Sequence, residues 1–69
     1  MLVLKGGNTM RLWLRQKRKA KYLSQQQVAT RIFVTQQHYS KIEQGCECSV
    51  DTAKRLASLL EFNWQELFE

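Results

Sequence analysis

Polar residues that commonly begin helices recur at short intervals along this chain and divide it into short segments. Ser24, Thr35, Ser49 and Asn63 each precede a segment with apolar residues at helical spacing. Proline is absent and only 3 glycines occur among the 69 residues, so little interrupts helices inside these segments. No strand is supported outside the first few residues. The sequence therefore predicts an all-α fold, a compact bundle of about five short helices in a single domain.

The first two predicted helices have recognisable inner faces. The first covers residues 10–21 and places Leu14 and the aliphatic stem of Arg18 four residues apart on one face. The second follows Ser24, where Gln27 three residues later completes a capping box. Its inner stripe consists of apolar residues at helical spacing: Val28, Ala29 and Ile32.

The remaining helices are delimited in the same way. Thr35 caps a third helix that runs through Gln44, and Gly45 stands where a helix end favours a left-handed residue. Ser49 caps a fourth helix and Asn63 caps a last turn. The inner face of the fourth helix is apolar: Ala53, Leu56, Ala57 and Leu60.

The N-terminal residues differ in composition from the rest. Residues 1–9 contain the turn-prone stretch Gly6-Gly7-Asn8, and we interpret them as a flexible arm preceding a domain over residues 10–69. A short pairing strand or an upstream extension of the domain are the alternatives. The apolar run Met1–Leu4 is too short for a signal peptide or a membrane span, so we expect a cytoplasmic protein without membrane contact.

Charge is distributed unevenly along the chain. Residues 1–42 carry nine Lys and Arg side chains and no acid, whereas residues 43–69 carry six acids and two bases. The net charge of +5 thus combines a basic part of +9 with an acidic part of −4. Such a division suggests that one face binds a polyanion, with nucleic acid as the first candidate and an anionic membrane surface as the second.

Metal binding and catalysis are not predicted. Cys46 and Cys48 form a C-x-C pair, His38 is a possible third ligand, and no fourth ligand is evident nearby. We expect two reduced thiols, no metal and no cofactor. The single histidine, with no nucleophile–His–acid set, no phosphate-binding glycine loop and no paired carboxylates, indicates a protein that is not an enzyme.

Residues 25–44 form a unit of two short helices joined by a tight turn. Ala29 offers the small side chain that a close helix crossing needs, Val34 lies in the turn, and Tyr39 and Ile42 face inward. The opposite side of the third helix carries only amide, hydroxyl and ammonium groups: Gln36, Gln37, Ser40, Lys41 and Gln44. These groups can hydrogen-bond to base edges in the major groove of DNA. A polar face alone is common on surface helices, but here it belongs to a capped helix pair in a basic region, which favours DNA reading.

The ordered set of these features resembles the Cro/C1-type (XRE-like) helix-turn-helix family, whose fold is the lambda-repressor-like DNA-binding domain. The resemblance covers about residues 10–69. The residues that carry it are Leu14-Arg15, Arg18, Leu23-Ser24-Gln25, Val28-Ala29, Val34-Thr35-Gln36-Gln37, Lys41-Ile42-Glu43-Gln44-Gly45, Ser49-Val50-Asp51-Thr52-Ala53-Lys54, Leu56-Ala57 and Trp64 to Phe68.

The resemblance implies roles for individual residues. Gln36, Gln37 and Lys41 fall where the family contacts bases, and Ser40 shares their face. The expected phosphate contacts are Gln25, Lys17 and Arg18. Arg18 and Glu43 match a pair that bridges the first and third helices.

The sequence also departs from the family pattern. Phe33 in the turn and Tyr22 after the first helix stand where glycine is frequent, and a glycine near Glu61 is missing. Cys48 replaces a proline before the fourth helix. Glu47 places an acid in a loop that often lies along the DNA backbone. These differences concern turn geometry, stability and the backbone contact, not the base-reading positions.

The sequence supports three functional hypotheses. The first is a bacterial or phage-encoded transcriptional regulator, a repressor, that binds a pseudo-palindromic operator as a homodimer. The second is the antitoxin of a toxin–antitoxin pair, and the third is a protein-interaction module without specific DNA binding. We expect the dimer contact in a C-terminal apolar stretch: Phe62, Trp64, Leu67 and Phe68. Core closure is the stronger interpretation for Trp64 and Leu67, which leaves Phe68 as the better candidate for an exposed contact.

Overall fold

The fold consists of short helices packed around one apolar core. The computed structural model describes residues 10–68, so the predicted arm over residues 1–9 lies outside the described residues. Four α-helices and one 3₁₀ helix follow one another: α1 (Leu12–Ala20), α2 (Gln25–Arg31), α3 (Gln36–Glu43), α4 (Val50–Leu60) and η1 (Trp64–Phe68). No strand occurs within residues 10–68. The predicted all-α fold of about five short helices is confirmed.

Helices α2, α3 and α4 begin where capping residues were predicted, whereas α1 begins at Leu12 and not at Met10. Ser24 Oγ accepts a hydrogen bond from the Gln27 backbone N–H at 3.1 Å, and Gln27 Oε1 accepts one from the Ser24 N–H at 2.8 Å. Thr35 Oγ1 accepts from the His38 N–H at 3.0 Å, and Ser49 caps α4 in the same way. Each contact satisfies a backbone donor that the first turn of a helix leaves free.

Within residues 10–68, four helix or turn ends have a left-handed backbone, and only one of these four residues is a glycine. Gly45 has a φ of 109°, as expected for the residue that ends the third helix. Tyr22, Phe33 and Glu61 have φ values of 59°, 66° and 64°. Glycine was expected from the family pattern at Tyr22 and Phe33 and near Glu61. The chain therefore keeps the turn geometry although each of these side chains has an unfavourable Cβ contact there.

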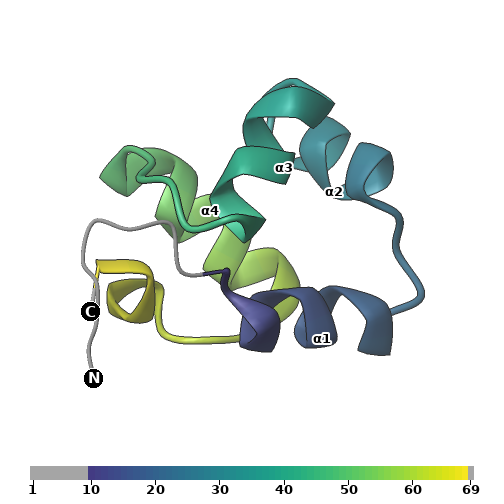
Figure 1. The fold of residues 1–69 in the computed structure, drawn as a ribbon, viewed down its shortest axis with the longest axis horizontal. Helices are drawn as coiled ribbons and strands as arrows, with labels where there is room; N and C mark the ends of the chain where they lie inside the picture. Colours follow the sequence, from purple (N-terminus) through teal and green to yellow (C-terminus); the bar gives the residue numbers. More distant parts are fainter. Residues whose placement is uncertain (1–9, 69) are drawn as a thin grey trace.

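Apolar side chains from all five helices meet in the interior. Figure 1 shows α2 and α3 next to each other and α1 along the opposite edge of the molecule, and α1 also contacts α3 directly. The core residues are no more than 2% exposed: Leu14, Val28, Ala29, Ile32, Tyr39, Ile42, Ala53, Leu56, Leu60 and Leu67. This core fixes α3 from one side and leaves the opposite side of that helix at the surface.

The C-terminal aromatic stretch closes the core. Leu67 is 2% exposed, and Trp64 packs against the core. The Phe62 ring makes an edge-to-face contact with Trp13, the ring centroids being 5.1 Å apart. Phe68 contacts the Trp64 ring from outside and stays 45% exposed. Of this stretch, Leu67 belongs to the interior of the monomer, whereas Phe68 offers apolar surface.

Candidate nucleic-acid interface

Helices α2 and α3 form a tightly crossed pair. Ala29 is fully buried at their crossing, and its carbonyl oxygen accepts a hydrogen bond from the Val34 N–H in the turn at 3.0 Å. The Val34 side chain packs against the core. Tyr39 and Ile42 anchor α3 with no exposed surface. Since both ends of α3 are held by this packing, its outer side chains have a fixed position relative to the rest of the domain.

The outer face of α3 is polar and free of acids. It consists of Gln36, Gln37, Ser40, Lys41 and Gln44. Gln36, Gln37 and Lys41 are exposed, and no side-chain hydrogen bond within residues 10–68 engages them. Ser40 is half-buried, and its hydroxyl accepts a bond from the Gln44 amide at 3.3 Å. The structure thus brings the four residues predicted to contact bases to one helix face, with most of their polar groups available to a ligand.

Behind this face, the buried carboxylate of Glu43 joins three helices. Arg18 Nε on α1 donates to Glu43 Oε2 at 2.6 Å, and the Tyr39 hydroxyl on α3 donates to the same oxygen at 2.6 Å. Gln25 Nε2 at the start of α2 donates to Glu43 Oε1 at 3.0 Å. Arg18 is 7% and Glu43 is 3% exposed. The ion pair expected between the first and third helices is therefore one part of a larger network.

The network sets the protonation of its members. Burial by itself would raise the pKa of Glu43, but hydrogen bonds from Arg18, Tyr39 and Gln25 lower that pKa below its ordinary value. The hydrogen bond to Glu43 raises the pKa of Arg18, and burial together with the bond to Glu43 raises the pKa of Tyr39. Glu43 is consequently an ionised acceptor at neutral pH, and Tyr39 is a neutral donor.

Comparison with known proteins decides what this helix pair is. The model of a helix-turn-helix family matches residues 14–67, which is most of the chain. The chain belongs to the Cro/C1-type helix-turn-helix family. No curated protein and no solved structure matches the chain significantly. The resemblance stated from the sequence is confirmed, and the helix-turn-helix domain is of the DNA-binding, transcription-regulator type.

The three residues expected to contact phosphates have different surroundings in this domain. Lys17 is half-buried on α1. The Gln25 amide already donates to Glu43 and keeps a second N–H. The Arg18 guanidinium donates to Glu43 and, at 2.9 Å, to the Leu23 carbonyl. This burial favours the ion-pair role of Arg18, and its phosphate contact stays a prediction.

Arg11 is an important residue of the helix-turn-helix domain that the sequence did not indicate. Its guanidinium donates to the backbone carbonyl of Ile42, and at 2.8 Å to those of Cys46 and Leu67. Its own N–H donates to the Glu43 carbonyl at 2.8 Å. Arg11 thereby joins the end of α3, the following loop and η1. Carbonyl acceptors exist at every position of a sequence, so no local pattern marks this contact.

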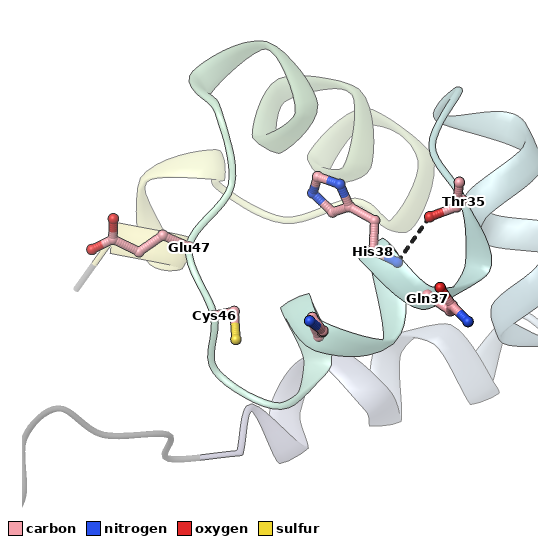
Figure 2. Close-up of a pocket in the computed structure, with 6 residues that line it drawn as sticks. Thr35, Gln37, His38, Cys46 and Glu47 are labelled. Carbon is pink, nitrogen blue, oxygen red and sulfur yellow. Dashed lines mark hydrogen bonds between the residues drawn. The ribbon is translucent and has the colours of Figure 1, made fainter.

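A hollow lies on the side of α3 that faces the following loop. Its volume is about 350 Å³, and its lining consists of Thr35, Gln37, His38, Lys41, Cys46 and Glu47. Figure 2 shows Gln37 and His38 on α3 and Cys46 and Glu47 on the loop, with the Glu47 side chain extending away from α3. The hollow therefore combines two residues predicted to contact bases, Gln37 and Lys41, with an acid that would repel a DNA phosphate.

The two cysteines are free thiols in that loop. Burial raises the pKa of the Cys48 thiol. Within residues 10–68, no three side chains of His, Cys, Asp or Glu lie close enough together to hold a metal ion. In the same part of the chain, no helix is long and apolar enough to cross a membrane.

Proposed function

We propose that this helix-turn-helix domain binds a specific double-stranded DNA site and represses transcription there. Helix α3 enters the major groove, and Gln36, Gln37, Ser40 and Lys41 contact base edges. The observation that carries the proposal is the acid-free outer face of α3, on which the exposed side chains of Gln36, Gln37 and Lys41 have no hydrogen-bond partners among residues 10–68. A glutamine amide matches the N6 and N7 atoms of adenine, and a lysine reaches O6 and N7 of guanine.

Backbone contacts complement the base contacts in this proposal. Lys17 and the free N–H of Gln25 lie on the two helices that flank α3, and both bind phosphates. The excess of nine basic side chains over residues 1–42 attracts the DNA irrespective of its sequence. Repression then follows from occupancy, because a protein bound across a promoter excludes polymerase from the overlapping DNA.

The domain acts as a homodimer on a pseudo-palindromic operator. One recognition helix contacts only a few base pairs, which limits the discrimination that a single domain can reach. Two copies related by a twofold axis would read half-sites about 34 Å apart, roughly one turn of the double helix. The exposed ring of Phe68 is our candidate for the contact between copies.

Selection of binding sites from random duplexes tests the proposed function. We expect an enriched sequence with twofold symmetry and half-sites roughly one helical turn apart. Placing that sequence over a promoter should lower transcription when the protein is present. Failure to enrich any sequence, with binding that depends on salt alone, would contradict specific recognition.

The antitoxin hypothesis has one observation in its favour. Tyr22 and Phe33 are 92% and 79% exposed, and a partner protein could cover these rings. A stoichiometric complex with a purified toxin, weakened by Phe33→Ser and unaffected by Gln37→Ala, would favour this hypothesis over a simple repressor.

A further inference from the structure

A second hollow lies on the other side of the outer face of α3, where α1, α2 and α3 come together. Its volume is about 350 Å³, and its polar lining consists of Arg15, Arg18, Gln25, Ser40, Glu43 and Gln44. At about 100° per residue, Ser40 and Glu43 lie toward one edge of the outer face, and Lys41 and His38 lie toward the other. The two hollows therefore border the base-reading face on its two sides.

The lining of this hollow suits an anion. The charge of Glu43 is balanced by Arg18, with which it forms a buried ion pair at 2.6 Å. Arg15 is exposed, and no carboxylate or hydrogen-bond acceptor within residues 10–68 pairs with it. The second N–H of Gln25 and the amide of Gln44 add neutral donors around the same space. Donors thus surround one uncompensated positive charge.

The position of the hollow identifies the anion. A helix that lies in the major groove has one sugar–phosphate backbone along each of its sides. When the outer face of α3 reads bases, this hollow faces one strand and the hollow containing Glu47 faces the other. We infer that Arg15 is a phosphate-contacting residue and that this hollow takes a backbone phosphate of the strand nearest α1. The planar guanidinium suits two-pronged hydrogen bonding to phosphate oxygens.

This inference rests on the proposed function and predicts a defined salt dependence. Each phosphate neutralised on duplex DNA releases about 0.9 of a counterion, which contributes that amount to the slope of log affinity against log salt concentration. Affinity falls as salt rises, so this slope is negative. Losing one phosphate contact should make the slope less steep by about 1 and leave the preference among bases unchanged. A slope change of about 0.9 corresponds to roughly an eightfold change in affinity over a tenfold change in salt.

The experiment measures duplex affinity over a range of salt for the wild type, Arg15→Gln, Arg15→Lys and Lys54→Gln. Lys54 is exposed on α4 outside the hollow, so its substitution removes an equal charge elsewhere. Arg15→Gln should make the negative slope less steep by about 1, whereas Arg15→Lys and Lys54→Gln should keep the wild-type slope. Urea unfolding checks that all four proteins are equally folded, as expected for exposed side chains.

Two results would overturn the inference. One is a wild-type slope for Arg15→Gln. The other is an equal loss of steepness for Arg15→Gln and Lys54→Gln, since that indicates general electrostatic attraction. The salt titration is made both with the selected operator and with an unrelated duplex. A phosphate contact exists on both, so the hollow is tested even if no preferred sequence is found. The failure of the proposed function, by contrast, appears as absent enrichment in the selection.

Discussion

Glu43 shows how one side chain couples the packing of the domain to α3. Its carboxylate receives hydrogen bonds from Arg18 on α1, Gln25 on α2 and Tyr39 on α3. Removing the carboxylate leaves a buried guanidinium without its counter-charge, which typically destabilises a protein by about 3–5 kcal/mol. That is a large part of the stability of so small a domain. The order of three helices thus depends on a single ionised group.

The first prediction concerns acid. The pKa of Glu43 is lower in the folded protein than its ordinary value of 4.5, so in acid the unfolded state binds more protons than the folded state. The stability that Glu43 contributes is complete above about pH 4.5 and is lost as the pH falls through the folded pKa. Carboxyl NMR titration should give a low midpoint for Glu43, and the free energy of unfolding should decrease over the same pH range. Glu66→Gln, a change at an exposed carboxylate, should keep this dependence, and an ordinary midpoint for Glu43 would contradict the network.

The second prediction concerns the left-handed backbone at Tyr22. This residue has a φ of 59°, and its ring is 92% exposed, so it has little packing to lose. Tyr22→Gly removes the Cβ contact, worth about 1–2 kcal/mol, and adds backbone freedom in the unfolded chain, worth about 0.5–1 kcal/mol. We expect a net stabilisation of about 0.5–1 kcal/mol by urea unfolding. Tyr22→Ala retains a Cβ and should bring no such gain, so equal effects of the two substitutions would refute the explanation.

At the scale of helices, the sequence predicted what depends on neighbouring residues. The caps at Ser24, Thr35 and Ser49 were predictable because capping involves a residue and the next three. The start of α1 was placed too early: the prediction began at Met10, and the helix begins at Leu12. Arg11 has a non-helical backbone there, and its contacts reach residues 31 to 56 positions away. Only the folded chain brings such partners together.

The candidate site follows the same rule. The composition of the outer face of α3 was predictable because a helix of 3.6 residues per turn assigns each residue to a side. The two hollows beside α3 were not, since each is built from side chains on separate elements, as with Arg15 on α1 and Ser40 on α3. Gln25 was expected to bind a phosphate, and its bond to Glu43 could not be foreseen from spacing.

The third prediction concerns α3 as a reading element. Gln36→Ala and Gln37→Ala should each weaken binding to the selected operator by about 1–3 kcal/mol. Binding to unrelated duplexes should change little, because phosphate contacts supply that affinity. Competition binding with operators altered at one base pair at a time measures the loss of discrimination. Gln65→Ala, on η1 at the C-terminal end, is the matched control and should behave like the wild type. Unchanged discrimination in both α3 variants would mean that another face reads the DNA.

On the scale of the whole molecule, basic and acidic charges are separated along the chain. The basic part over residues 1–42 contains α1, α2 and all of α3 except Glu43, whereas six of the eight charged side chains in residues 43–69 are acidic. The acidic part includes η1, where Phe68 is 45% exposed while Leu67 is buried. Acids disfavour contact with DNA, and an exposed aromatic ring favours contact with protein. The basic part thus suits DNA, and Phe68 is an exposed ring in the part of the chain that DNA does not attract.

The last prediction is that operator binding is dimeric and depends on Phe68. Sedimentation at a concentration near the dissociation constant should give two proteins per palindromic site for the wild type. Phe68→Glu places a charge in the proposed contact and should reduce this to one protein per site, with weaker binding. Gln65→Glu adds the same charge to the same helix without removing the ring, so it should still give two proteins per site.

Because Phe68 also contacts Trp64, urea unfolding must first show that Phe68→Glu remains folded. Two proteins per site for a folded Phe68→Glu variant would place the dimer contact elsewhere. Only one wild-type protein per palindromic site at saturation would exclude the dimer.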